Sequence, residues 1–479
     1  MMRAMLLVPL SFVAGGLACR YWLAGAPAAA AAGLAQPVAV VTYWQSFGAW
    51  MWLALFVAVA AASAVYALLL RAALRGEYAG ARAAVRDACI ASALALAAAL
   101  AFPVIFSSDV YAYGAYGAMA LHGIDPYAHL RLTTHDPLFA AAIWQWGNPP
   151  PVCVYGPAFV WIASLFAGAL HGYGVAVQLL GLRVLASLAL VSCAPLLYAA
   201  LAGFPPNHRV AAAIGIALNP VAIWSAAEGH NDALMLAVVL AGFVLARRGW
   251  LAGGSFAIAA SALIKAPGLA AAAALAAFQW CDRSRFARVV AGAAAGTLFV
   301  AIASLPFEWG LRNVLVPHGH YAPQFSAQYL LARALQAVVP PAFALPLGVA
   351  LVLTAAGVLA CYGVALAARG TREGALYMAL GLWLAIPNPY PWYALWILPV
   401  AFVAIESRAA WMLVLASLTI VFRYLPDATT ASNANANAIV TLCELALPFA
   451  ALRFRAGGRA RDPNARPQGS VASGPPGKP

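Results

Sequence analysis

Long apolar runs recur along the whole 479-residue chain, and they limit its possible folds more than any other feature. Hydrophobic residues make up 65% of the sequence and charged residues only 9%, with a mean hydropathy of +0.85. A soluble domain needs more polar surface than this to cover its core. The runs also lack the apolar–polar alternation of a transmembrane barrel. The sequence therefore predicts an all-α polytopic membrane protein with about 12–14 transmembrane helices.

The formal net charge of +13 has a simple explanation in a membrane protein. In a soluble protein this charge would suggest a nucleic acid partner. Here the arginines fall in short loops and in the C-terminal tail, which is typical of positive-inside topology and contact with anionic lipids. One early loop, which we assign to the cytoplasm, carries four of them: Arg71, Arg75, Arg82 and Arg86. We expect membrane lipids, and no nucleic acid, among the partners.

The remaining composition indicates one membrane unit with a short tail. The seven cysteines are scattered without a CxxC pair, so we predict neither a disulfide framework nor a zinc site. The first apolar segment, about residues 4–23, has the length of a signal peptide, but further spans follow and favour a retained helix. Residues 1–456 are expected to form the transmembrane domain. Residues 457–479, rich in Pro, Gly, Ser and Arg, are expected to be a disordered cytoplasmic tail.

Residues 107–155 are too many for a simple connector, and we expect an extracytoplasmic loop with short interfacial helices. If every apolar segment crossed the membrane, Arg247 and Arg248 would lie outside. The conflict disappears if the short segment 156–170 is re-entrant or interfacial instead. Four polar stretches then share the side of Asp109: residues 228–232, 265–267, 306–324 and 388–393.

Asp109 is the leading candidate for a reactive group. It follows an apolar segment almost directly, and Tyr111 and Tyr113 come next. A partly desolvated carboxylate has a raised pKa, which suits a general base that activates a sugar hydroxyl. The tyrosines can bind substrate beside it. The alternative is a carboxylate that only occupies a turn at a helix end.

A second polar cluster consists of Glu228, His230, Asn231 and Asp232. Capping of the following helix accounts for one or two of these groups but not for all of them. Binding of a sugar or an acceptor is the functional interpretation. The spacing matches no defined metal site, so we predict no metal ion.

Five further residues are candidates for substrate binding, each with an ordinary alternative. Lys265 lies in an apolar run and can meet a lipid phosphate or extend to the interface. Arg333 is a second candidate for the phosphate. His320 can contact substrate or be a solvated loop histidine. Trp392 and Tyr393 can stack on a sugar or prenyl chain, or belong to an interfacial aromatic belt.

Five motifs, taken in order, resemble the GT-C superfamily of glycosyltransferases that use polyprenyl-phosphate sugars. They are SSDVYAYGAYG with HGIDPY (107–127), VYGPAF (154–159), ALNPVAIWSAAEGHNDALM (217–235), SALIKAPGL (261–269) and NPYPWYALW (388–396). The closest resemblance is to bacterial polyprenol-phosphate-mannose-dependent alpha-mannosyltransferases. It implies a multi-span bacterial inner-membrane enzyme with Asp109 as the base, facing the outside. It also implies a lipid-linked hexose donor, most often mannose, inversion at the anomeric carbon and a lipid or glycan acceptor.

The single carboxylate in Ser107-Ser108-Asp109 departs from the acidic pair of many superfamily members. This agrees with a monophosphate donor and with a reaction that needs no cofactor or metal. A secondary transporter or lipid-linked sugar flippase is the alternative from another class, and it would predict internal inverted repeats, which we do not find. A third possibility is a non-catalytic assembly subunit, in which Asp109 would affect partner binding but not turnover.

Overall fold

The computed structural model describes residues 1–24, 40–102, 104, 106–128, 130–307, 323–425 and 434–453. Within these ranges, side chains are described except at residues 18–52 and 452–453. Within these ranges the chain is all helical, without a β-strand. The helices of the first half are α1 Met2–Met5, α2 Leu7–Ala24, α4 Val40–Leu74, α5 Ala81–Leu100, α6 Asp109–Leu121, α7 Pro137–Trp146, α8 Pro157–Ala169, α9 Val175–Ala200, α10 Pro206–Ala217, α11 Pro220–Ala227 and α12 Asp232–Arg247.

The second half continues in the same way, with several short 3-10 turns. Its elements are α13 Leu251–Ala260, η1 Ser261–Leu263, α14 Gly268–Phe278, α15 Arg283–Ser304, η2 Leu305–Phe307, α17 Ala327–Leu335, α18 Pro341–Ala368, α19 Glu373–Ala385, η3 Pro391–Tyr393, α20 Ala394–Ala401, α21 Arg408–Thr419, η4 Ile420–Tyr424, α23 Ala434–Ala446 and η5 Leu447–Arg453. The predicted tail at 457–479 lies outside the described residues.

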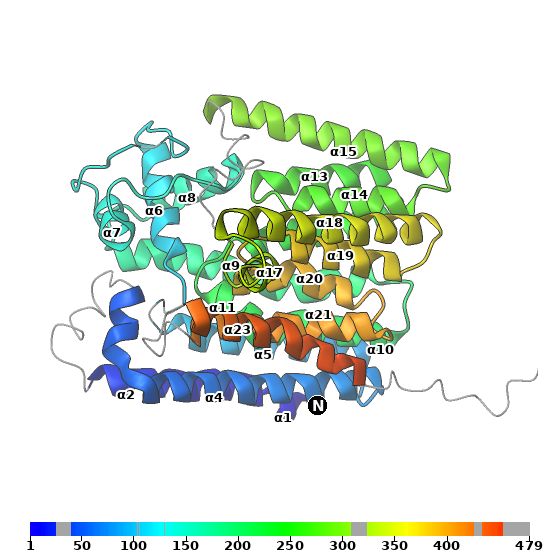
Figure 1. Cartoon of the computed structure of the whole chain (residues 1–479), viewed down its shortest axis with the longest axis horizontal. Helices are drawn as coiled ribbons and strands as arrows, with labels where there is room; N and C mark the ends of the chain where they lie inside the picture. Colours follow the sequence, from blue (N-terminus) through cyan, green and yellow to red (C-terminus); the bar gives the residue numbers. More distant parts are fainter. Residues whose placement is uncertain are drawn as a thin grey trace, which may run out of the picture.

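Most long helices lie side by side along the long axis of the molecule, while α6, α7 and α8 gather at one end (Figure 1). Six described helices are long and apolar enough to cross a membrane, or seven if the bent pair α10–α11 is one span. Further apolar helices of 10–17 residues, such as α8 and α14, are shorter than a span. The predicted polytopic helical fold is confirmed. The count of about 12–14 crossings depends on the shorter helices and stays a prediction.

The loops at the end opposite α6 carry many of the arginines, as predicted. Asn207 Nδ2, at the start of α10, donates to the carbonyl of Leu74, the last residue of α4, at 2.8 Å. Arg372, just before α19, lies 4.2 Å from the ring centre of Phe204. The 20-residue helix α5 separates this end from α6 by about 30 Å. The basic loops and Asp109 therefore lie at opposite ends of the bundle.

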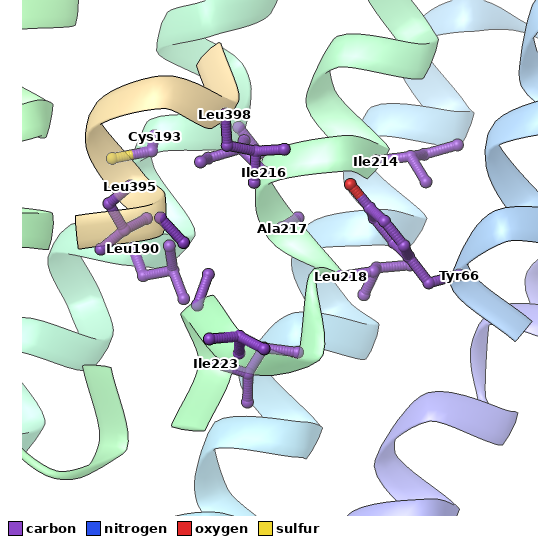
Figure 2. Packing of buried hydrophobic residues seen from close by; sticks show 14 of the residues in the cluster. Tyr66, Leu190, Cys193, Ile214, Ile216, Ala217, Leu218, Ile223, Leu395 and Leu398 are labelled. Carbon is purple, nitrogen blue, oxygen red and sulfur yellow. The ribbon is translucent and has the colours of Figure 1, made fainter. Parts of the chain in front are cut away.

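The central core packs α4, α5, α9 to α12, α20 and α21 through buried aliphatic side chains such as Leu190, Ile216 and Leu395 (Figure 2). Tyr66 of α4 is fully buried, and its hydroxyl donates to the carbonyl of Gly215 in α10 at 3.0 Å. A Cβ atom at Gly215 would lie 1.9 Å from the Phe402 ring, so only glycine allows this approach. Close packing of this kind holds α10 against both α4 and α20.

A bend of 44° between α10 and α11 directs the chain toward α6. Ala217 is the last residue of α10, and Asn219 caps α11 by accepting from the N–H groups of Val221 and Ala222, both at 3.0 Å. Pro220 takes the first position of α11, where no N–H is needed. The bend delivers the polar turn 228–232 to the end of the bundle that holds Asp109.

Candidate active site

Asp109 is the first residue of α6, and the segment before it is held by a buried carboxylate. Glu228 Oε1 accepts from the N–H of Phe106 at 2.6 Å and from the indole N–H of Trp224 at 3.0 Å. The N–H of Asp109 itself donates to Ser107 Oγ at 3.3 Å. A carboxylate in the first helical turn is also stabilised by the helix dipole. These contacts fix the position of the Asp109 side chain.

Two tyrosine hydroxyls donate to the Asp109 carboxylate. Tyr155 reaches Oδ2 at 3.2 Å, and Tyr113, one helical turn along α6, reaches it at 3.4 Å. The two hydroxyls are themselves 3.2 Å apart. No group in the described ranges donates to Oδ1, and the side chain is 20% exposed. One oxygen of this carboxylate is therefore available to a substrate.

Burial raises the pKa of the Asp109 carboxyl above its ordinary value, while the positive charge of Lys265 and the hydrogen bond from Tyr155 lower it. The burial effect is the largest of these. A carboxylate with a raised pKa is a stronger base than one in water, provided that it stays ionised at the working pH. The environment of Asp109 therefore fits general-base chemistry.

His230 completes the group around Asp109. Its Nδ1 lies 3.4 Å from the hydroxyl of Tyr113 and 3.9 Å from Asp109 Oδ2. The residue is 1% exposed, and burial, followed by the charge of Lys265, lowers its pKa well below the ordinary value. The imidazole is therefore neutral at neutral pH. We call Asp109, Tyr113, Tyr155 and His230 the Asp109 cluster.

Asp232 and Lys265 form a buried ion pair next to this cluster. Lys265 Nζ donates to Asp232 Oδ2 at 2.7 Å, and the two side chains are 10% and 0% exposed. The indole N–H of Trp396 donates to the other carboxylate oxygen at 2.6 Å. Three rings surround the ammonium, with centroids 5.1–5.6 Å from Nζ: Tyr155, Tyr393 and Trp396. Such a cage stabilises a cation away from water.

The turn between α11 and α12 explains why His230 and Asp232 point inward. Gly229 has a φ of +94°, a conformation that glycine adopts without strain, and it lies against Val110 of α6.

Asn231 is 1% exposed, and neither its Oδ1 nor its Nδ2 has a hydrogen-bond partner in the described part of the chain. Buried amides are rarely left unsatisfied without a functional reason.

The structure brings most of the predicted residues together, but not all of them. Trp392 stacks on His230 at 3.7 Å, and Tyr393 borders the Lys265 ammonium. Tyr111 is two positions from Asp109, about 200° around α6, and the charges that act on it are those of Arg183 and Glu228. Its expected contact with the same substrate stays a prediction.

Two other predicted residues make their contacts away from the Asp109 cluster. Glu228 binds the backbone of Phe106, so it supports the loop. Arg333 donates to Gln336 at 3.0 Å and to Asn435 of α23 at 3.2 Å, outside the contacts of the Asp109 cluster. His320 lies outside the described residues.

Sequence reasoning missed Tyr155 and Trp396 as site residues. Tyr155 lies in the motif VYGPAF and Trp396 in NPYPWYALW. The motifs therefore indicated the right segments, but not which of their side chains contact Asp109 or Asp232. No group of three or more His, Cys, Asp or Glu side chains is arranged to hold a metal ion in the described part of the chain. Metal independence stays a prediction.

Comparison with known proteins adds an independent observation. Residues 7–281 match the model of the alpha-(1->6)-mannopyranosyltransferase family, N-terminal domain. The chain belongs to this family. The matched region contains the whole Asp109 cluster and the Asp232–Lys265 pair, whereas Trp392 and Trp396 follow it. The predicted GT-C mannosyltransferase resemblance is therefore confirmed.

Two bacterial relatives carry the same name. Over 195 residues the chain is 30% identical to alpha-(1->6)-mannopyranosyltransferase A of Corynebacterium glutamicum, covering 40% of this chain and 38% of the relative. Over 167 residues it is 32% identical to the Mycobacterium tuberculosis protein of that name, covering 34% and 31%. The alignments thus span about two fifths or less of each relative's length. No solved structure matches the chain.

Proposed function

We propose that this protein is an integral membrane mannosyltransferase. In this proposal a mannose passes from a polyprenyl-phosphate donor to an acceptor hydroxyl on the extracytoplasmic face of the bacterial cytoplasmic membrane. Membership of the family supports mannosyl transfer. The separation of the Asp109 cluster from the basic loops supports an outward-facing site, because arginine-rich loops favour the cytoplasmic side.

The observation that carries the proposal is the accessibility of Asp109. The site contains two neighbouring carboxylates, but both oxygens of Asp232 already accept hydrogen bonds, one from Lys265 and one from Trp396. Asp109 has 20% of its side chain exposed and one oxygen that takes no hydrogen bond from the described residues. A general base must come within hydrogen-bond distance of the proton that it removes. Asp109 meets this requirement and Asp232 does not.

The proposed reaction is a single displacement. Asp109 takes the proton from the acceptor hydroxyl, whose oxygen forms a bond to the anomeric carbon of mannose. The bond between that carbon and the phosphate oxygen breaks, and its electron pair leaves with the lipid phosphate. The configuration at the carbon inverts. General-base catalysis of this kind contributes about 10²- to 10⁴-fold to the rate.

The surrounding residues have separate proposed roles. Tyr113 and Tyr155 hold the carboxylate in place through Oδ2. The neutral His230 and the unpartnered amide of Asn231 can bind sugar hydroxyls, because each offers polar atoms without a partner in the described residues. An ammonium has three N–H donors, and Asp232 accepts one from Lys265. Lys265 therefore supplies a positive charge near the departing phosphate, and no metal or other cofactor is required.

The test is a transfer assay with purified protein in nanodiscs. Radiolabelled polyprenyl-phosphate-mannose and a lipid extract of actinobacterial membranes are supplied, and parallel reactions contain GDP-mannose or polyprenyl-phosphate-glucose. We expect a new labelled product only with the polyprenyl-phosphate-mannose donor, in the presence or absence of EDTA. Transfer from GDP-mannose alone would contradict the donor assignment.

The alternative of a transporter or flippase predicts a different result. In that case no donor would give a labelled product, and protein in liposomes would move the lipid-linked sugar between leaflets. The purified protein can be reconstituted in liposomes and tested for this movement with a sugar-binding lectin outside the vesicles. Movement without transfer would replace the proposed function.

A further inference from the structure

Four flat side chains from distant segments form a column that ends at the Asp109 cluster. The Arg423 guanidinium lies 3.8 Å from the ring centre of Tyr390. Tyr390 stacks on Trp392 at 4.5 Å with planes 7° apart, and Trp392 stacks on His230 at 3.7 Å with planes 15° apart. We call Arg423, Tyr390, Trp392 and His230 the stacked column. It connects η4 and the loop before α20 to the turn before α12.

Stacking sets the orientation of the inner half of this column. His230 Nε2 has no hydrogen-bond partner in the described part of the chain, so only Nδ1, beside Tyr113, has a polar contact. Trp392 is 5% exposed, and no hydrogen bond to its indole occurs among the described residues. A ring held at one atom can still rotate about that contact. The flat face of Trp392 therefore decides the plane of the imidazole.

Hydrogen bonds fix the outer half. Arg423 is 7% exposed and donates to the carbonyl of Pro389. The hydroxyl of Tyr390 accepts from Asn388 Nδ2 at 3.1 Å. A guanidinium over an aromatic face adds an attraction that strengthens when both groups are removed from water. Arg423 thus anchors the end of the column that lies farthest from Asp109.

A buried carboxyl group on α23 interacts with this anchor of the column. Glu444 of α23 is 2% exposed, and neither carboxyl oxygen has a hydrogen-bond partner in the described residues. The charge of Arg423 acts on this group. The carbonyl of Glu444 accepts from Oγ1 of Thr419, the residue directly before η4, at 3.0 Å. The C-terminal helix is thereby tied to the anchor of the column.

We propose that Arg423 is a positioning residue for the transfer reaction. Through the stacked column it holds His230 against Tyr113 and Asp109, although it touches neither the substrate nor the base. The inference rests on the proposed function. It also assigns a role in the site to residues beyond position 281, where the family match ends.

The first test uses a matched pair of arginines. Arg209, at the opposite end of the bundle, lies 3.9 Å over Tyr198 and donates to its carbonyl at 3.1 Å, much as Arg423 contacts Tyr390 and Pro389. Lysine keeps the charge but loses the flat contact. For Arg423→Lys we expect kcat to fall about 2- to 30-fold at an unchanged donor KM. Arg209→Lys should keep the wild-type kcat, and equal losses in both variants would overturn the proposal.

The second test asks whether the effect passes through His230. Arg423→Lys is combined with His230→Ala in a double-mutant cycle on kcat. We expect the double variant to lose no more activity than His230→Ala alone, because the column has nothing left to position. Independent, multiplicative losses would overturn the proposal. Tyr390→Phe, which keeps the ring but loses the bond from Asn388, should retain more activity than Tyr390→Leu, which loses both.

Both tests remain informative if the proposed function is wrong. If Asp109→Asn retains full transfer, the assignment of Asp109 as the base is wrong, whatever the effect of the column variants. Should Asp109→Asn abolish transfer while the column variants behave independently of His230, only the positioning role of Arg423 fails. Thermal unfolding in detergent, measured on every variant, identifies a loss of folded protein.

Discussion

Replacing Tyr155 with phenylalanine is expected to make mannosyl transfer more sensitive to acid. The hydroxyl of Tyr155 donates to Asp109 Oδ2 at 3.2 Å, and this bond lowers the pKa of the Asp109 carboxyl by stabilising its ionised form. Phenylalanine removes the donor but keeps the ring that packs edge-on against Tyr113 at 5.0 Å and faces Lys265. The pKa of Asp109 should therefore rise without a collapse of the site.

The size of the shift follows from the hydrogen bond. A bond to a charged group contributes about 1.5–3 kcal/mol, and about 1.4 kcal/mol corresponds to one pKa unit. The distance of 3.2 Å is long for an O–H···O bond, and a fifth of the Asp109 side chain is exposed, so the lower end applies. We expect a rise of about one unit. Tyr113→Phe should give a smaller rise, since its distance is 3.4 Å.

The assay is the pH dependence of kcat/KM in nanodiscs. The base must be ionised, so activity falls as the pH drops through the pKa of Asp109, and a raised pKa moves this fall to higher pH. At high pH the variant should approach the wild-type rate. Tyr116→Phe is the matched control. Tyr116 lies on α6 with Asp109, is 3% exposed and donates to the Pro151 carbonyl at 3.0 Å. An unmoved midpoint, or an equal loss at every pH, would refute this account.

Three further predictions concern stability and geometry. Asp109→Asn should raise the melting temperature at neutral pH. Burial raises the pKa of the Asp109 carboxyl, so its ionised form costs stability above that pKa. The gain in melting temperature should shrink as the pH falls toward about 4, the pKa of an aspartate in the unfolded chain. Lys265→Met leaves Asp232 buried without its cation and should lower the free energy of unfolding by about 3–5 kcal/mol, measured with denaturant. The double variant Lys265→Met/Asp232→Asn should recover part of this loss, and additive losses would contradict the prediction. Glu228→Leu frees the N–H of Phe106 and should lower kcat up to about 10²-fold with little change in donor KM, measured by steady-state kinetics; a change in KM alone would instead indicate substrate binding.

Much of the site follows from the sequence because polar side chains are rare in this chain. A carboxylate, an imidazole or an ammonium is costly in an apolar helix bundle unless it meets another polar group. The polar side chains on one side of the predicted topology therefore had to converge. Asp109, His230, Asp232, Lys265 and Trp392 do so, although they come from four separate segments.

The pairing of these groups could not be predicted, because it depends on distances of a few ångströms between segments. Glu228 looked like a sugar ligand, but the bend after α10 turns it toward the backbone of Phe106. Lys265 was a candidate for a lipid phosphate, but its hydrogen bond to Asp232 was not predicted. Arg423 was not among the predicted residues, because its contact with Tyr390 joins segments more than 30 residues apart.

The most direct test of the central claim compares two carboxylates of the same loop. Asp109→Asn and Asp125→Asn are purified and assayed for transfer from polyprenyl-phosphate-mannose at one protein concentration. Asp125 accepts from the N–H of Tyr127 at 2.9 Å and takes no part in the Asp109 cluster. Our account predicts that Asp109→Asn loses about 10²-fold or more of the activity while Asp125→Asn keeps it. Wild-type turnover by folded Asp109→Asn would contradict the account.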